Sequence, residues 1–245
     1  MVDLHAHILC GIDDGAKTLE ESIKMCRMAY DDGIRSIVLT PHVGKFPNTS
    51  EIIKDKYLEL KSNLAVLDIP VKLFTGADVE LEPDLINKLK SSKFLSINNS
   101  RYFLLDTPST LLPPNMIDYV AVLVSSGLIP VITHPERCLQ MQGDLNFLYG
   151  IVKAGALVQI TAASILGKMG QDAKDTAIKI LEFGLAHIIA TDCHGVDRRR
   201  PRLFEAVLVA KSIVGESNAL EMVTTVPQDI INNRPLKFRE PKKPK

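Results

Sequence analysis

Residues 2–42 read VDLHAHILCGIDDGAKTLEESIKMCRMAYDDGIRSIVLTPH, and this stretch decides the fold. Short apolar runs at 2–4 and 34–40 predict two strands. Between them, a capping box that begins at Thr18 predicts the start of a helix, and Gly33 predicts its end. A strand, a helix and a second strand in this order form the repeating unit of a parallel sheet.

The same alternation continues along the chain, with five more apolar runs separated by helical patterns. Predicted strands cover 2–4, 34–40, 71–76, 101–105, 129–133, 156–160 and 187–191, and further predicted helices cover 52–67, 116–126, 145–154 and 173–183. Near-continuous hydrophobicity is typical of parallel strands that are covered on both faces. The pattern predicts an α/β fold in which seven strands form a nearly closed barrel, as a single domain over residues 1–245. The basic, proline-rich tail from Arg234 to Lys245 is expected to be solvated.

The composition argues against several classes of protein. The chain has 245 residues, of which 46% are hydrophobic, with 29 basic and 29 acidic side chains and a pI near 7.0. A net charge of zero argues against a dedicated binder of nucleic acid or anionic membrane. No apolar run reaches the roughly 18 residues of a spanning helix and no signal peptide opens the chain, so we expect a soluble, cytoplasmic protein without membrane insertion. Four cysteines at irregular spacing predict reduced thiols.

Polar residues that could bind metal follow most of the predicted strands. They are His5 and His7 after the first strand, His42 after the second, Asp78 after the third, Asp106 after the fourth, His134 after the fifth, and Asp192 and His194 after the seventh. In a parallel barrel these strand ends meet at one face, where functional groups gather. Residues two apart in an extended chain, such as His5 and His7, point to the same side. Imidazole and carboxylate are ligands for Zn²⁺, Mn²⁺ and Fe²⁺.

The number of candidate ligands exceeds what one metal ion needs. Asp13 and Asp14 in the first loop add two more carboxylates, so the set predicts a two-metal or three-metal phosphoester hydrolase. His187 begins its strand and is expected to be structural. Arg137 and the run 198–200 follow ligand-bearing strand ends, where a guanidinium could grip a phosphate, although at least one of the three consecutive arginines is expected to be solvated.

A cysteine-based alternative also has to be weighed. Cys193 and Arg199 match the Cys-x5-Arg spacing of thiolate-dependent tyrosine phosphatases. The loop between them carries Asp197, which would repel phosphate, and it has one glycine, which is few for a cradle of backbone amides. Strand alternation also turns Cys193 away from Asp192 and His194. We therefore expect metal chemistry rather than a cysteine nucleophile.

With these residues in place, the chain resembles the polymerase and histidinol phosphatase (PHP) superfamily, and within it the bacterial tyrosine-protein phosphatases of the capsule and exopolysaccharide type. The resemblance rests on DLHAH at 3–7, GIDDG at 11–15, TPH at 40–42, HPER at 134–137 and ATDCH at 190–194. It extends over nearly the whole chain, and the opening motif with its Asp-Asp-Gly is specific to that subgroup.

The resemblance implies a distorted (β/α)7 TIM-like barrel of the PHP fold that holds three divalent metals, with manganese as the first expectation and iron or zinc as alternatives. By analogy, one metal is held by His5, His7 and Asp192, a second by His134 and Asp106, and a third by Asp14, His42 and His194, with Asp78 as the bridging carboxylate. Arg137 and Arg199 match arginines that hold the substrate phosphate, and Asp192 or another coordinating carboxylate is expected to orient the attacking water. The implied substrate is phosphotyrosine in the tail of a bacterial tyrosine kinase that controls polysaccharide export.

Two positions depart from the family pattern, because Asp78 and Asp106 stand where the family usually has Glu. Each side chain is one methylene shorter, and Glu80, two residues along on the same face, is an alternative bridge. Two other functions stay open. A histidinol-phosphate phosphatase would use the same cluster on an alkyl phosphate, and a non-catalytic adaptor would bind the phosphorylated kinase tail without turnover.

Overall fold

A computed structural model describes residues 1–82, 85–91, 95–237 and 240–244. The strands are β1 (Val2–Ala6), β2 (Ser36–Leu39), β3 (His42–Val43), β4 (Lys72–Thr75), β5 (Asp78–Glu80), β6 (Tyr102–Asp106), β7 (Ile129–Thr133), β8 (Leu157–Thr161) and β9 (Ile188–Ala190). The α-helices are α1 (Leu19–Asp31), α2 (Ser50–Val66), α3 (Leu85–Ser91), α4 (Met116–Ser125), α5 (Leu139–Gly143), α6 (Leu145–Lys153), α7 (Ala162–Ile165), α8 (Gln171–Glu182), α9 (Phe204–Val214), α10 (Glu216–Glu221) and α11 (Thr225–Ile231). Two 3-10 helices are η1 (Ile97–Asn99) and η2 (Pro135–Arg137).

The strand pairings in the described residues are all parallel. One sheet has the order β1-β2-β4, and the other has the order β3-β5-β6-β7-β8-β9. β3 directly continues the course of β2, and β5 continues that of β4, so the two sheets share two strand positions. A bridge between Ala6 and Cys193 joins β1 to the segment after β9. The pairings and this bridge link seven strand positions in a ring, and they confirm the predicted α/β fold with parallel strands.

The ring is distorted where β1 meets β9. On its other side, the pairing of β1 with β2 shifts register between Asp3 and Ala6. At the amino ends of the strands, the Val2 amide donates to the Val223 carbonyl at 2.7 Å and the Ile189 amide donates to the Met222 carbonyl at 3.3 Å. The segment after α10 therefore takes the place of direct pairing at this end, and β1 and β9 meet only toward their carboxyl ends.

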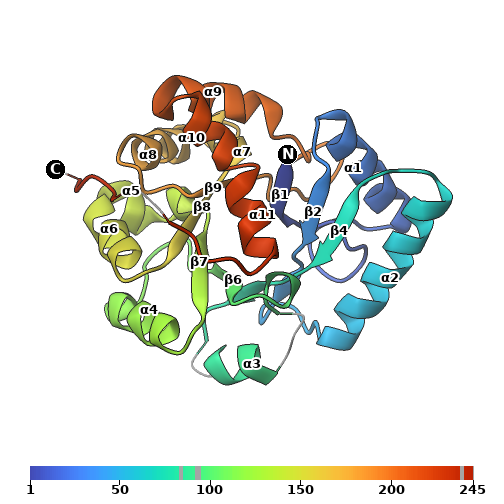
Figure 1. Cartoon of the computed structure of the whole chain (residues 1–245), viewed down its shortest axis with the longest axis horizontal. Coiled ribbons are helices and arrows are strands. Elements are labelled where there is room, and N and C mark those ends of the chain that lie inside the picture. Colours follow the sequence, from blue (N-terminus) through green and yellow to red (C-terminus); the bar gives the residue numbers. More distant parts are fainter. Residues whose placement is uncertain (83–84, 92–94, 238–239, 245) are drawn as a thin grey trace.

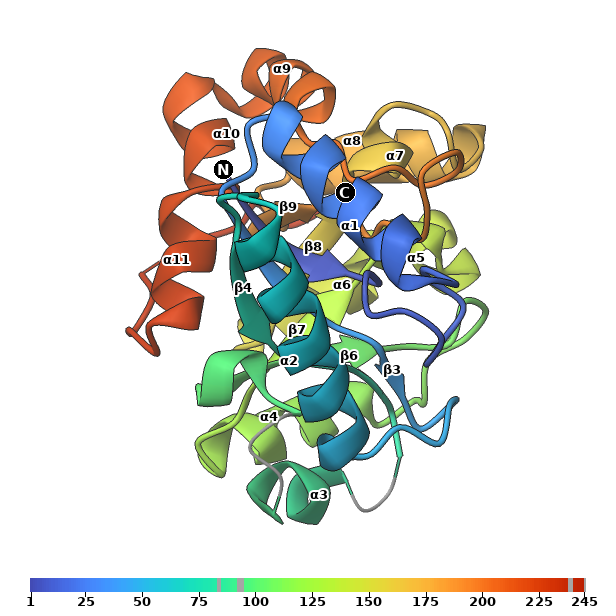
Figure 2. The same ribbon diagram turned by 90° about the vertical axis from the view of Figure 1, so that its right-hand side faces the viewer.

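Two apolar clusters hold the barrel together. The inner cluster lines the barrel with side chains such as Leu4, Leu104 and Val131, and Ile230 and Ile231 of α11 join it. Figures 1 and 2 place α11 beside the amino end of β1, so this helix covers the end of the barrel opposite the strands' carboxyl ends. The outer cluster packs helices such as α1 and α2 against the outside of the strands, as Figure 2 shows.

Local signals located five of the eleven α-helices in the described residues. The Thr18 side chain accepts a hydrogen bond from the Glu21 amide at 3.2 Å, as a capping box requires. The other four predicted helices correspond to α2, α4, α6 and α8, with ends that differ by one or two residues. The short helices α3, α5, α7, α10 and α11, and also α9, were not predicted.

Two predicted strands end within one residue of the expected position, and each is followed by a short strand that was not predicted. The strand at 34–40 breaks before Pro41, which has no amide hydrogen to donate to a ladder. The strand at 71–76 breaks at Gly76, where an added Cβ would lie 2.9 Å from Val38 Cγ1. Both breaks lie next to candidate ligands, and they turn the chain into β3 and β5.

The tail is less solvated than its composition suggests. The Lys242 amide donates to the Phe183 carbonyl at 2.8 Å, and Lys153 Nζ lies 2.6 Å from a Glu240 carboxylate oxygen. These contacts hold the described part of the tail against α6 and the end of α8, although most of its side chains are exposed. None of the helices in the described part of the chain has the length and apolarity to cross a bilayer.

Candidate metal centre

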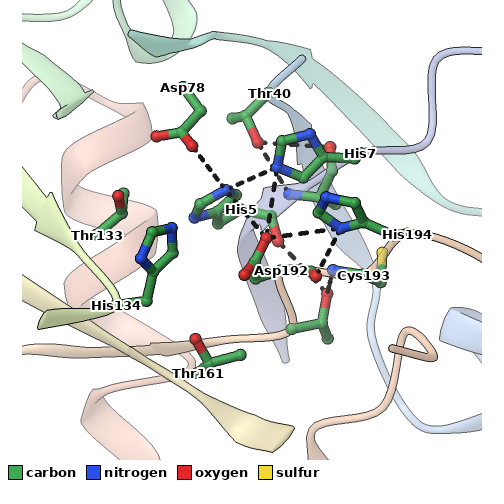
Figure 3. A network of polar contacts seen from close by, with 12 residues as sticks. His5, His7, Thr40, Asp78, Thr133, His134, Thr161, Asp192, Cys193 and His194 are labelled. Atoms are coloured by element: carbon green, nitrogen blue, oxygen red, sulfur yellow. Dashed lines mark hydrogen bonds and ion pairs between the residues drawn. The ribbon is translucent and has the colours of Figure 1, made fainter. Parts of the chain in front are cut away.

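The first group of candidate ligands lies where β1 meets the end of β9. The Ala6–Cys193 bridge brings His5 and His7 next to Asp192 (Figure 3). The Nε2 atoms of His5 and His7 are 3.0 Å apart, and they lie 3.5 and 3.4 Å from Asp192 Oδ1. Two ligand atoms about 2.1 Å from one ion are about 3.0 Å apart at a right angle and about 3.4 Å apart at the tetrahedral angle. The three atoms therefore have the spacing of ligands to one ion.

A second group surrounds Asp14, in the loop after β1. Its Oδ1 lies 3.6 Å from His42 Nε2 and 3.4 Å from His194 Nε2. The His7 ring lies beside the His194 ring, with centroids 4.0 Å apart, so this group adjoins the first. The Asp14 side chain is 46% exposed, so solvent reaches the cluster from this side.

A third group contains the two shortened carboxylates. Asp78 Oδ2 lies 3.5 Å from His5 Nε2 and 3.3 Å from His42 Nδ1, between the other groups. Asp106 at the end of β6 has Oδ2 3.7 Å from His42 Nδ1 and Oδ1 3.7 Å from His134 Nε2. The structure thus brings together the nine residues that the family resemblance assigned to metals.

The unpaired polar atoms of this cluster fit metal ions. Both carboxylate oxygens of Asp78 and Nε2 of His194 are buried and have no hydrogen-bond partner among the described residues. A buried carboxylate without a partner is costly, and a cation removes that cost. Glu80, the alternative bridge, is exposed at the rim, whereas Asp78 is fully buried. Imidazole and carboxylate donors in this number suit divalent ions such as Mn²⁺, Fe²⁺ and Zn²⁺.

The pKa values of the cluster are moved far apart. Burial lowers the pKa of His7, but hydrogen bonds to Asp13 and Asp192 outweigh it and raise the pKa to about 10. Burial lowers the pKa of His134 to about 3. Burial and a neighbouring carboxylate raise the pKa of Asp106 to about 7. Because a metal ligand must be unprotonated, metal binding has to displace a proton from His7.

Two buried residues orient the first pair of imidazoles. Gln159 Oε1 lies 2.9 Å from His5 Nδ1, and Asp13 Oδ2 lies 2.8 Å from His7 Nδ1. An Nδ1–H that donates to these oxygens leaves the Nε2 lone pair directed into the cluster. Asp13, which the sequence placed among the candidate ligands, therefore lies behind His7 as a support. Gln159 was missed because it lies inside an apolar strand, where no spacing marks it.

Three residues of the site have left-handed backbone conformations. The φ angles are 38° for His134, 50° for Asp192 and 49° for Arg199. This conformation costs roughly 1–2 kcal/mol for a residue with a side chain. His134 directly follows β7 and Asp192 lies two residues after the end of β9, so the chain turns at both places and presents the side chain to the cluster.

A cavity of about 380 Å³ opens beside the cluster, and both predicted phosphate-binding arginines line it. Arg137 Nη1 lies 2.8 Å from Asp192 Oδ2, and Arg199 Nη2 contacts the same oxygen. Arg198 and Arg200 are exposed, which confirms that part of the arginine run is solvated. The cavity therefore has a floor of carboxylates and imidazoles with two guanidinium groups over it.

The cysteine alternative fails on geometry. Cys193 is fully buried, and it is not among the described residues that line the cavity. Burial raises its pKa well above the ordinary thiol value, which disfavours the thiolate. His187 is also buried at the start of β9, where Nδ1 accepts a hydrogen bond from the Val158 amide at 3.0 Å, as expected of a structural histidine.

Comparison with known proteins places this site in a family. The family model for capsular polysaccharide synthesis proteins, CpsB/CapC, matches residues 1–232. The tyrosine-protein phosphatase YwqE of Bacillus subtilis strain 168 is 32% identical over 246 residues, which cover 100% of this chain and 96% of YwqE. The tyrosine-protein phosphatase CpsB of Streptococcus agalactiae serotype III is 28% identical over 240 residues, which cover 95% of this chain and 99% of CpsB.

Solved structures agree with the family model. A chain from the crystal structures of YwqE from Bacillus subtilis and CpsB from Streptococcus pneumoniae, described as unique metal-dependent tyrosine phosphatases, matches with a TM-score of 0.95 at 31% identity, covering 100% of both chains. The phosphotriesterase from Mycobacterium tuberculosis matches with a TM-score of 0.62 at 11% identity over 95% of this chain and 94% of its own, a likeness of fold alone. The chain belongs to the CpsB/CapC family of capsular polysaccharide synthesis proteins.

Proposed function

We propose that this chain is a metal-dependent protein-tyrosine phosphatase. The observation that carries the proposal is the cluster of histidines and aspartates beside a cavity with two guanidinium groups. Bound divalent metals would supply charge neutralisation for a phosphate monoester and hydroxide near neutral pH. The relatives named tyrosine-protein phosphatases, which match nearly the whole chain, support the same activity.

The proposed ligand sets follow the three groups of side chains. One ion would be held by His5, His7 and Asp192, one by Asp106 and His134, and one by Asp14, His42 and His194, with Asp78 shared between ions. Manganese is the proposed metal, because mixed imidazole and carboxylate donors suit it, and iron or zinc are the alternatives. The spacing of the candidate ligand atoms and the unpartnered oxygens of Asp78 support this assignment.

Arg137 and Arg199 are proposed to hold the substrate phosphate. Their side chains are 28% and 24% exposed and both contact Asp192 Oδ2, so the guanidiniums already face the cluster. A guanidinium can donate two hydrogen bonds to two oxygens of one phosphate. Asp192 is proposed to orient the attacking water, because one carboxylate oxygen faces the imidazoles and the other faces the guanidiniums. The reaction consumes water and releases tyrosine and inorganic phosphate.

The proposed substrate is phosphotyrosine in the tail of a bacterial tyrosine kinase that controls capsule or exopolysaccharide synthesis. The family's link to capsular polysaccharide synthesis supports this choice. Such a tail would meet the enzyme in the cytoplasm, and the enzyme would act as a single domain over residues 1–245.

The test compares substrates and variants. The protein should hydrolyse a phosphotyrosine peptide much faster than histidinol phosphate, and His194→Ala should abolish hydrolysis while circular dichroism shows an intact fold. Cys193→Ser, the matched control on the neighbouring residue, should retain activity. Faster hydrolysis of histidinol phosphate would overturn the substrate class. Tight binding of the phosphopeptide without turnover, in protein loaded with metal, would indicate an adaptor instead.

A further inference from the structure

Two exposed leucines follow, along the chain, residues that line the cavity. Leu111 is 70% exposed and Leu139 is 61% exposed. The segments that carry them run side by side, because the Leu139 amide donates to the Ser109 carbonyl at 2.9 Å and the Gln140 amide donates to the Thr110 carbonyl at 3.0 Å. We call Leu111 and Leu139 the leucine rim.

The leucine rim is continuous with the cavity wall. Pro108, Ser109 and Cys138 line the cavity, and the rim leucines follow them within three residues along the chain. The Cys138 thiol donates to the Thr110 carbonyl at 3.3 Å, which fixes the two segments together. The cavity therefore has a charged floor, and the segments that form this part of its wall carry the two exposed leucines just beyond it.

We propose that the leucine rim binds an apolar side chain next to the phosphotyrosine of a peptide substrate. This inference rests on the proposed function, because a phosphate held at the guanidiniums of Arg137 and Arg199 would place the peptide backbone at the cavity opening. An extended peptide advances about 3.3 Å per residue, so the residues flanking the phosphotyrosine pass over this part of the wall. Adjacent exposed apolar side chains beside a site mark a contact for a partner, whereas single ones elsewhere on a surface do not.

The charges around the cavity favour a phosphopeptide as the occupant. Arg137, Arg199 and Lys45 line the cavity and suit a dianionic phosphate. The leucines add apolar contact that a free phosphate or a small aryl phosphate would not reach. The leucine rim therefore affects which phosphotyrosine peptides the enzyme prefers, and it does not change the chemical step at the histidine and aspartate cluster.

The experiment measures kcat/KM for matched phosphotyrosine peptides built on a serine and glycine background. Four peptides carry one leucine, at one or two residues before or after the phosphotyrosine, and a fifth carries none. The wild-type protein should prefer at least one leucine peptide over the fifth by about tenfold, since burying part of a leucine side chain gives this order of gain. The Leu111→Ser/Leu139→Ser double variant should lose the preference and hydrolyse 4-nitrophenyl phosphate at the wild-type rate.

The control variant is Leu208→Ser, which changes a leucine that is 48% exposed on α9. It should keep the preference. Equal rates for all five peptides in the wild-type protein, or an unchanged preference in the double variant, would overturn the inference while hydrolysis of 4-nitrophenyl phosphate continued. Loss of all phosphatase activity in the wild-type protein would instead overturn the proposed function, and the inference with it.

Discussion

Gly15 packs against the backbone of His7 so closely that no side chain fits. An added Cβ would lie 2.2 Å from the His7 carbonyl oxygen and 2.7 Å from His7 Cβ, where ordinary contacts begin at 3.4 Å. Gly15→Ala must therefore move the loop by at least 3.4 − 2.2 = 1.2 Å. The movement would break the bond from the Gly15 amide to Asp13 Oδ1 and the bond from the Ala16 amide to the His7 carbonyl.

One of these bonds has a charged acceptor and one is neutral, so their loss should lower the free energy of unfolding by about 2–4 kcal/mol. Displacement of Asp13 and Asp14 should also reduce metal content and phosphotyrosine hydrolysis. Denaturant unfolding, elemental analysis and peptide hydrolysis measure the three effects. Gly143→Ala is the matched control, because an added Cβ there meets nothing within 4 Å. Wild-type stability and activity in Gly15→Ala would refute the reasoning.

Three further predictions concern buried groups. Asp13→Asn should weaken metal affinity by about 10–100-fold, because it removes the carboxylate behind His7; chelator competition measures this, and unchanged affinity would contradict it. Burial lowers the pKa of His7, but hydrogen bonds to carboxylates outweigh it and raise the pKa to about 10, so metal affinity should rise about tenfold per pH unit between pH 7 and 9, above the pKa of Asp106, and a flat profile in calorimetry would show that no proton is displaced. Burial lowers the pKa of His187 from 6.5 to about 4, so the unfolded chain takes up a proton first as pH falls, and stability should be lost between pH 6.5 and 4. In the His187→Asn variant, the asparagine Oδ1 can accept the hydrogen bond from the Val158 amide. Between pH 6.5 and 4 its free energy of unfolding should therefore fall by about 3 kcal/mol less than that of the wild type, as measured by denaturant unfolding, and parallel pH curves for the two proteins would contradict this.

The strand ends that carry the site were predictable because in each case an apolar run is followed by a histidine or an aspartate. His5, His42 and His134 each follow a run, and a parallel barrel gathers the carboxyl ends of its strands at one face. The pattern also separated His187, which precedes its run, from the histidines of the cluster. These placements depend only on strand direction, so sequence alone could give them.

Other features depend on contacts between distant segments. Gln159 supports His5 from another strand, 154 residues away in sequence, and no local signal distinguishes it from a neutral strand residue. The choice between Asp78 and Glu80 depends on which of the two side chains is buried in the barrel. The two residues lie two positions apart in a strand and point to the same face, so the sequence pattern does not distinguish them. The insertion of Met222 and Val223 between strands arises from tertiary packing, because neither residue belongs to a predicted strand.

The central claim is that metal ions held by the histidine and aspartate cluster carry out phosphotyrosine hydrolysis. The most direct measurement is hydrolysis of a phosphotyrosine peptide by metal-stripped protein during titration with Mn²⁺, with bound metal counted in the same samples. The account predicts no hydrolysis without metal and a rise in rate that follows the filling of the site. Undiminished hydrolysis by protein shown to contain no metal would contradict it.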